Sequence, residues 1–317
     1  MKEIGGYFGL EQFKSDEWYK DLISLNNGRN ALLYLLKVKN VRKLYIPYYL
    51  CDVISNMLKM NNYEFEYYRI DSDFMPLFDK NLHEDEYLYV VNYYGQFTNE
   101  KILAIKEQFG QIIVDYTHAF FQKPILGIDT IYTCRKFFGV PDGAYLSTDM
   151  RLDEELEIDI SKDRMTHLLG RYEGLASDYY NCFRKTDEFF KKEPIKFMSK
   201  LTHNILGAID YERIRKIREQ NHAYLESKLY NQNKLILVAP EGAFTYPFYL
   251  ENGIEIRKTL AQKKIYIPTL WPNVLTDTPE DSIENDYAAS ILPLPCDQRY
   301  GIEDMEYIVE EIKKCIN

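Results

Sequence analysis

An aspartate and a lysine that follow short apolar segments are the residues whose types and spacing could do chemistry. Ile112 to Val114 has the length and β-branched content of a buried strand, and it delivers Asp115 at its carboxyl end. A second apolar segment, 128–132, leads to Lys136 in a glycine-punctuated connection before a strand-like run at 144–147. Such a lysine could be held close to a planar, phosphorylated carbonyl compound. Taken alone, a loop lysine is more often solvated, and an aspartate at a strand end usually caps a turn or a helix.

A turn that feeds directly into a helix is a second candidate. Asn26, Asn27 and Gly28 make a turn, and Arg29 to Lys37, rich in Ala, Leu and Lys, is a strong helical run. The start of a helix leaves backbone N–H groups unpaired, which suits a phosphate. An ordinary Asn-capped helix is the alternative interpretation.

The elements that must position these residues alternate along the chain. Strands are predicted at Lys43–Pro47, 63–70 and 87–92, with a helix at 52–59 between the first two. Strand, helix and strand in repeated alternation predict a mainly parallel sheet flanked by helices. Ligands of such sheets bind beyond the carboxyl ends of the strands, where Asn92, Asp115 and Lys136 are expected.

The carboxyl-terminal part is predicted to be organised differently. A long amphipathic helix is predicted at 211–229, and it leads into a smaller set of elements. These are expected strands at 235–239, 246–250 and 265–268, a helix at 254–263, a Pro-rich strand or loop at 291–300 and a closing helix at 302–315.

Four segments together resemble a known family, the DegT/StrS-type aminotransferases among the fold-type-I pyridoxal phosphate (PLP) enzymes. They are NNGRNAL (26–32), YIPYYLCDVI (45–54), IVDYTHAFF (113–121) and TCRKFFGVPDGAYLST (133–148), with a weaker similarity at 209–229. The resemblance implies an α/β fold with a mainly parallel central sheet of the seven-stranded type. It also implies a large PLP-binding domain at 20–205, a small C-terminal α/β domain at 206–317, and an N-terminal arm at 1–19.

The resemblance assigns a task to each matched residue. Lys136 would join the aldehyde of PLP covalently and then move a proton, and Asp115 would face the pyridine nitrogen. The implied catalytic residues are Lys136 and Asp115, and the implied cofactor-binding residues are Gly28, Arg29, Asp115, His118, Thr133 and Lys136. Asp142 and Gly143 would shape the turn after the lysine.

The chain departs from the family pattern at a few positions. An aromatic residue that stacks on the cofactor ring is common where this chain has Cys51, so Tyr48 or Tyr49 is expected to compensate. Asn181 and Arg184 loosely match residues that reach into the neighbouring subunit's site in the family.

The implied reaction is transfer of an amino group, with glutamate as the expected donor, to a keto-sugar attached to a nucleotide, for surface polysaccharide or a related glycoconjugate. The partners are small molecules, and a homodimer is expected because the family's sites lie between subunits. Alternatives are another PLP reaction, such as decarboxylation or dehydration, on a smaller substrate, and a non-catalytic protein that keeps the fold. Five residues are candidates for substrate contact: His167, Arg171, Trp271, Asn273 and Arg299.

Composition limits these possibilities. The 317 residues include 39 Lys and Arg against 49 Asp and Glu, and no polybasic tract occurs, so binding to nucleic acid or an anionic membrane is disfavoured. The five cysteines show no CxxC pair and no metal-ligand spacing with the five histidines, so free thiols and no metal are expected. No segment has the apolar length of a signal peptide or a membrane span, which predicts a cytoplasmic protein.

Overall fold

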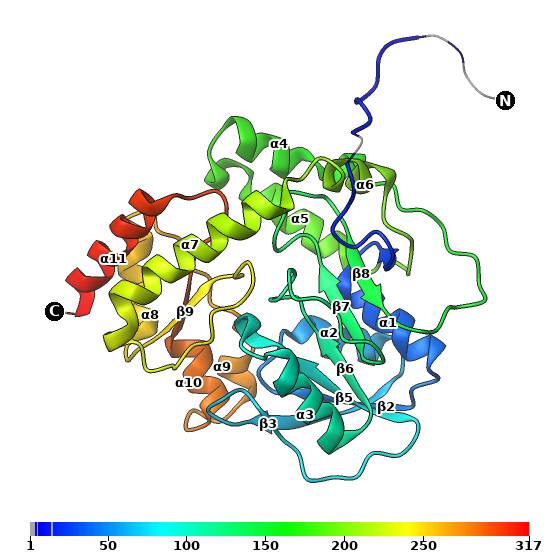
Figure 1. Ribbon diagram of the computed structural model, residues 1–317, viewed down its shortest axis with the longest axis horizontal. Coiled ribbons are helices and arrows are strands. Elements are labelled where there is room, and N and C mark those ends of the chain that lie inside the picture. Colours follow the sequence, from blue (N-terminus) through cyan, green and yellow to red (C-terminus); the bar gives the residue numbers. More distant parts are fainter. Residues whose placement is uncertain (1–3, 5, 14, 317) are drawn as a thin grey trace.

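A large mixed sheet organises the chain, as the computed structural model in Figure 1 shows for residues 4, 6–13 and 15–316. The strand order is β1-β8-β7-β6-β5-β2-β3-β4, in which β4 adds two residues to the edge of a seven-stranded arrangement. The strands are β1 (Ile23–Leu25), β2 (Lys43–Pro47), β3 (Glu64–Ile70), β4 (Pro76–Leu77), β5 (Glu86–Val91), β6 (Ile112–Asp115), β7 (Asp129–Thr133) and β8 (Ala144–Ser147). The α/β fold with a mainly parallel central sheet is confirmed.

Pairing within the sheet follows the alternation that the sequence predicts. Strands β3, β2, β5, β6 and β7 are parallel neighbours, and β8 runs antiparallel to both β7 and β1. The helices of this part are α1 (Gly28–Val38), α2 (Asp52–Met60), α3 (Asn99–Phe109), α4 (Thr166–Glu173), α5 (Tyr180–Phe190) and α6 (Lys200–Leu206), with the short 3-10 helix η1 at Tyr93–Gly95.

Two crossover helices cover opposite faces of the sheet. The step from β2 through α2 to β3 moves toward one edge, and the step from β5 through α3 to β6 moves toward the other. Because such crossovers are right-handed, the two helices must lie on different faces. Figure 1 shows α3 in front of the sheet and α2 behind it.

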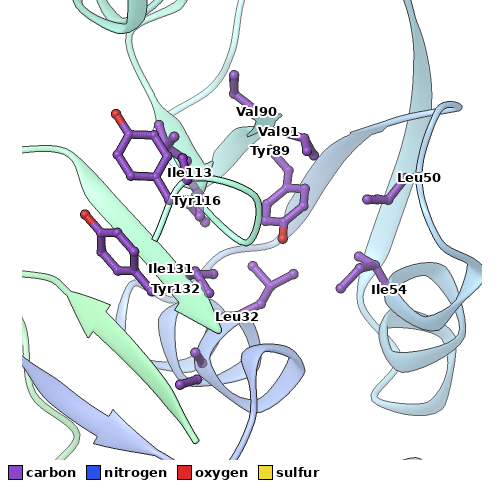
Figure 2. Packing of buried hydrophobic residues seen from close by; sticks show 14 of the residues in the cluster. Leu32, Leu50, Ile54, Tyr89, Val90, Val91, Ile113, Tyr116, Ile131 and Tyr132 are labelled. Atoms are coloured by element: carbon purple, nitrogen blue, oxygen red, sulfur yellow. The ribbon is translucent and has the colours of Figure 1, made fainter. Parts of the chain in front are cut away.

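The central strands are buried on both faces. All four residues of β6 are buried, and so are five of the six residues of β5. This is the pattern of a parallel sheet covered on both sides. Figure 2 shows part of the packing, in which Leu32 of α1, Ile54 of α2 and Ile131 of β7 belong to one apolar cluster. The carboxyl ends of these strands are therefore held by a close-packed core.

The C-terminal elements build a second apolar cluster beside the sheet. This cluster is formed by residues of α7 (Tyr211–Leu229), β9 (Tyr246–Tyr249), α8 (Gly253–Gln262), β10 (Ile291–Leu294) and α11 (Ile302–Ile316). The short helices α9 (Val274–Asp277) and α10 (Ile283–Ser290) pack against the core of the sheet instead, through Val274 and Tyr287. Strands β9 and β10 form an antiparallel pair, and α7 runs from the sheet toward α11 (Figure 1). The division at residue 206 stays a prediction.

Two strands predicted in the C-terminal part, 235–239 and 265–268, are wrong, because both segments are irregular in the structure. The first of these segments satisfies its backbone with a side chain instead of a neighbouring strand. Val238 donates its N–H to Oε1 of Gln96 over 2.7 Å, and its carbonyl accepts from Nε2 of Gln96 over 3.0 Å. An apolar sequence pattern cannot show whether a backbone pairs with a neighbouring strand or with a side chain.

The N-terminal arm predicted at 1–19 lies in part outside the described residues, and its described part contains no helix. It is attached near α6, where Phe13 N–H donates to Oδ1 of Asn204 over 2.8 Å. Within the described ranges, no helix combines the length and apolar character that a bilayer span requires, and no cluster of His, Cys, Asp or Glu is arranged to hold a metal ion. All five cysteines are free thiols.

The centre of β6 should dominate stability. Ile113 is fully buried, so replacing it by alanine should reduce the free energy of unfolding by about 2–5 kcal/mol through lost burial and a residual cavity. Ile236→Ala is the matched control, because that side chain is 92% exposed. Urea denaturation followed by circular dichroism measures both variants. Equal midpoints for the two would contradict the position of β6 at the centre of the core.

Candidate active site

A cavity of about 300 Å³ opens at the carboxyl ends of β5, β6 and β7 and at the start of α1. All six residues that the sequence predicts for the site line it: Gly28, Arg29, Asp115, His118, Thr133 and Lys136. The fold therefore brings together residues that are more than a hundred positions apart in the chain.

The start of α1 forms one end of this cavity. Asn27 caps the helix by accepting from Asn30 N–H over 2.9 Å. A side chain at Gly28 would place its Cβ 2.5 Å from Cγ2 of Thr133, so only glycine allows β7 to approach the helix this closely. In the described part of the chain, Oγ1 of Thr133 and Nδ2 of Asn27 are buried and have no hydrogen-bond partner. Buried polar atoms of this kind are costly unless a ligand satisfies them.

Asp115 ends β6 at the same edge of the sheet. Its Oδ2 accepts from the hydroxyl of Tyr89 over 2.7 Å, and its Oδ1 accepts from Thr117 N–H over 2.7 Å. Tyr89 belongs to β5, the parallel neighbour of β6, and it lines the cavity as well. The two bonds fix the carboxylate while it borders the cavity.

Lys136 lies in a tight turn after β7. Phe137 and Phe138 donate their N–H groups to the carbonyl of Cys134, and Cys134 N–H donates to the carbonyl of Gly143. Gly143 N–H in turn donates to the carbonyl of Asn26 over 2.7 Å. The lysine turn is thereby joined to the turn that starts α1.

The C-terminal lobe holds the same turn from the other side. The carbonyl of Phe137 accepts from Nη2 of Arg218 over 3.2 Å and from Nε2 of Gln298 over 2.7 Å. Arg218 is buried on α7 and also donates to the carbonyl of Ala243 over 2.8 Å. Its guanidinium lies 4.5 Å from the ring centroid of Phe137.

His118 contacts the lysine directly. Its Nε2 lies 3.1 Å from Nζ of Lys136, and its Nδ1 accepts from Tyr94 N–H over 3.4 Å. The imidazole stacks nearly parallel to Phe244, with centroids 4.2 Å apart, and nearly parallel to Trp271, with centroids 5.6 Å apart. Two aromatic rings of the C-terminal lobe thus fix the plane of a histidine of the sheet domain.

Burial and charge shift the titration of both groups. Burial, together with the Lys136 charge, moves the pKa of His118 well below its usual value, so this imidazole is neutral near pH 7. Lys136 keeps accessible surface because it borders two cavities, yet burial among the surrounding atoms is the main cause that lowers its pKa. The negative charges of Asp115 and Asp187 oppose this shift.

Cations gather around the cavity as well. Arg29, Arg135 and Lys191 all line it. Arg135 donates to Oδ1 of Asp187 over 2.8 Å, and burial lowers the pKa of Arg29. Against the net charge of -10 of the whole chain, this is a local basic environment that favours an anionic ligand.

A second cavity of about 670 Å³ shares Arg135 and Lys136 with the first. Three of the five residues predicted for substrate contact line it: His167, Arg171 and Arg299. Trp271 lines the first cavity instead. The fifth, Asn273, lines neither, because its Nδ2 donates to the carbonyl of Leu50 over 3.1 Å and fixes a loop.

Other predicted positions lie away from the cavities. Neither Tyr48 nor Tyr49 covers the first cavity, so that expectation is wrong: Tyr48 stacks on Tyr67 with centroids 4.6 Å apart, and Tyr49 is buried against Tyr94. Cys51 and Trp271 occupy the wall.

Three polar residues that the sequence singled out also lie outside both cavities. Asn92 is buried and bonds to the backbone of Phe97. Asn181 and Arg184 are exposed on α5, so a role in a neighbouring subunit's site stays a prediction.

Five contributing residues were missed in the sequence: Tyr89, Asp187, Arg218, Phe244 and Gln298. Arg218 left a signal, because it falls on the apolar face of the helix at 211–229, in phase with the buried Tyr211, His222 and Leu225. An arginine in that phase must find buried acceptors. The other four left no such signal, because their roles depend on contacts between distant segments.

Comparison with solved structures gives the class of fold. A sugar aminotransferase from Streptococcus pneumoniae, Spr1654, superposes with a TM-score of 0.64 at 13% identity, over 92% of this chain and 85% of that chain. A DegT DnrJ EryC1 StrS aminotransferase from Brucella abortus gives 0.61 at 13%, also over 92% and 85%. CalS13, a sugar aminotransferase from Micromonospora echinospora, gives 0.62 at 11%, over 92% and 87%.

The chain therefore has the fold of the fold-type-I PLP enzymes. Within that class, it has the fold of the DegT/DnrJ/EryC1/StrS sugar aminotransferases, as the resemblance predicts. No protein-family model and no curated sequence matches it.

Proposed function

We propose that the protein is a PLP-dependent aminotransferase that transfers an amino group, with glutamate as donor, to a keto-sugar attached to a nucleotide. The observation that carries this proposal is the convergence of an amine, a carboxylate and a helix start with unpartnered polar atoms on one cavity. When bound, PLP supplies an aldehyde that carries the amino group and a ring that accepts electrons released at the substrate carbon.

The residues present fit this cofactor. The N–H groups at the start of α1, the unpartnered Thr133 hydroxyl and the Asn27 amide provide donors for a phosphate. Asp115, held by Tyr89 and Thr117, provides the negative charge that pairs with a protonated ring nitrogen. Lys136 provides the amine for the aldehyde.

The chain's own groups supply the proton transfers. Lys136 Nζ would act as the base that takes the proton from the α-carbon of the amino donor, and its lowered pKa favours the uncharged amine that this needs. His118 holds Nζ within hydrogen-bond distance. The Lys136 turn keeps its position because both lobes bond to it.

The second cavity suits the acceptor. It adjoins Lys136 and carries Arg171 and Arg299, so a diphosphate could be held while the keto carbon reaches the lysine. Arg299 is anchored by Asp297, which accepts from its Nε and Nη2 over 2.7 Å each. This anchoring holds one guanidinium at the rim of the cavity. Decarboxylation or dehydration of a smaller substrate remains the alternative, since the same cofactor supports it.

A homodimer also belongs to the proposal. Exposed large apolar side chains occur on the helices next to the cavities, namely Leu169 and Tyr172 of α4 and Tyr180, Phe183 and Phe189 of α5. A second copy that covers them would close the cavities from outside.

The first prediction concerns colour. The purified protein, or the protein after addition of PLP, should absorb in the visible range, and Lys136→Ala should abolish this absorbance because no amine remains to react with the aldehyde. Lys216→Ala, an exposed lysine on α7, is the matched control. Borohydride reduction followed by peptide mass spectrometry should locate the cofactor on residue 136. Wild-type protein that stays colourless with PLP would contradict the proposal.

The second prediction concerns the phosphate end. Thr133→Val keeps the side-chain shape and removes the hydroxyl, so the affinity for PLP should fall roughly ten- to a hundredfold, the value of one hydrogen bond to a charged group. Thr259→Val, on the exposed side of α8, should leave it unchanged. Equilibrium dialysis gives both constants. Unchanged affinity of Thr133→Val would place the phosphate elsewhere.

The third prediction concerns the reaction. Mixing the PLP-loaded protein with L-glutamate should bleach the visible absorbance and release a stoichiometric amount of 2-oxoglutarate. Adding a keto-sugar nucleotide should then restore the colour and yield the amino sugar, measured by mass spectrometry. Failure with every common amino donor would instead favour a decarboxylase or dehydratase.

A further inference from the structure

The contact between His118 and Lys136 has two possible proton arrangements. In one, Nε2 of His118 carries the hydrogen and donates to an uncharged Lys136 amine. In the other, Nδ1 carries it, and Nε2 accepts from a charged Lys136 ammonium. The distance of 3.1 Å between Nζ and Nε2 fits both.

The backbone on the far side of the ring distinguishes them. Tyr94 N–H points at Nδ1 of His118 over 3.4 Å, so Nδ1 accepts a hydrogen bond and the ring hydrogen belongs on Nε2. A hydrogen on Nδ1 would point directly at the hydrogen of Tyr94 N–H. Two donors would then face each other in a site from which solvent is excluded, since His118 is only 2% exposed.

The turn that directs Tyr94 N–H toward His118 has an unusual backbone conformation. Tyr94 has a φ of 55°, a left-handed conformation that a bulky residue rarely adopts. Gly95 follows with a φ of 74°, and a Cβ there would lie 2.8 Å from Cβ of Pro240. The Tyr94 hydroxyl is tied to the Tyr49 hydroxyl at 3.1 Å. Surrounding contacts therefore impose the conformation that aims Tyr94 N–H at the imidazole.

The ring cannot easily tilt to escape this arrangement. Phe244 and Trp271 lie within 13° and 8° of its plane. Both come from the C-terminal lobe, whereas His118 and Lys136 come from the sheet domain. The plane of the imidazole, and with it the direction of the Nε2–H bond, is thus set by packing between the two lobes.

We propose that Tyr94 N–H fixes the His118 tautomer with the hydrogen on Nε2, so that His118 donates to Lys136 and stabilises its uncharged, nucleophilic amine. His118 is in this sense a positioning residue for the lysine before any ligand binds. The inference rests on the proposed function only for the role of the uncharged Lys136 amine in catalysis. The positions of the protons can be measured without the cofactor.

Some other groups around the Lys136 amine favour its charged form, and others favour its uncharged form. Asp115 on β6 and Asp187 on α5 favour the charged form, whereas burial raises the pKa of the Cys51 thiol before α2 and leaves it uncharged near pH 7. The Phe244 ring, whose centroid lies 5.4 Å from Nζ, also favours the charged form. Burial favours the uncharged form. The cations Arg29, Arg135 and Lys191 line the same cavity. The His118 donor adds to the effect of burial.

The tautomer is tested on the cofactor-free full-length chain with ¹⁵N-labelled histidine. His118 is assigned by comparison with His118→Gln. Near pH 7, its Nε2 should resonate as a protonated ring nitrogen and its Nδ1 as an unprotonated acceptor. The reverse pattern would overturn the proposal, because Nε2 would then accept from an ammonium.

The consequence for the amine is tested by titrating the ¹³C-labelled lysine side chains, with Lys136→Arg to assign the signal. His118→Phe keeps the stacking on Phe244 and removes the donor, so the Lys136 midpoint should rise by on the order of one pH unit, the worth of one hydrogen bond. His118→Gln retains an N–H in a similar place and should restore most of the wild-type midpoint. Equal midpoints in wild type and His118→Phe would overturn the proposal.

These outcomes are separate from those of the colour experiment. A chain that never binds PLP but shows the Nε2–H tautomer and a shifted lysine would keep this inference and lose the proposed function. A yellow protein with the Nδ1–H tautomer would do the reverse.

Discussion

Everything in the site depends on how the turn around Lys136 is held. On one side, Gly143 N–H bonds to Asn26, which ties the lysine turn to the start of α1. On the other side, Arg218 and Gln298 of the C-terminal lobe bond to the Phe137 carbonyl. Because the buried guanidinium has several acceptors and stacks on Phe137, losing any one partner would leave a buried donor or acceptor unsatisfied. The position of the lysine therefore depends on contacts from the start of α1 and from the C-terminal elements together.

The sheet adds a second constraint, because it determines which polar groups meet. Parallel strands end at a common edge, so Asp115 of β6 and Thr133 of β7 face the same space, and Tyr89 reaches Asp115 from the neighbouring strand. The Thr133 hydroxyl is left without a partner within the described structure, next to a glycine that permits close approach of α1. A fold that buries a polar atom in this way loses stability unless a ligand supplies the missing bond. An unpartnered buried hydroxyl is therefore expected in a binding site and not in a structural core.

Most of the sheet could be predicted from the sequence, because its strands are short apolar runs separated by helical periodicity, and β2 and α7 have the predicted bounds. The positions of Asp115 and Lys136 followed from the strand ends, whereas Thr133 came from the family resemblance and Asn92, expected at the same edge, lies outside the cavity. The segment at 235–239 was mistaken for a strand because Gln96, which bonds to its backbone, lies far away in sequence. For the same reason, no local pattern shows that Trp271, and not Tyr48 or Tyr49, lines the wall near Cys51. Contacts between the two lobes are what single-sequence reasoning cannot supply.

The two cavities differ in how their residues are supported, and this difference bears on substrate choice. The first is built largely from the ends of buried strands and the start of α1, so its shape depends on the core of the sheet. The second shares the lysine turn with the first, but its other residues, including those of α4 and Arg299, lie on elements outside the sheet. Substitutions at Arg171 or Tyr172, which are exposed, would alter the acceptor side and leave the strand ends intact. In the proposed function, the chemistry at Lys136 can therefore stay constant while residues of the second cavity change with the acceptor, because the two sets of residues lie on different elements.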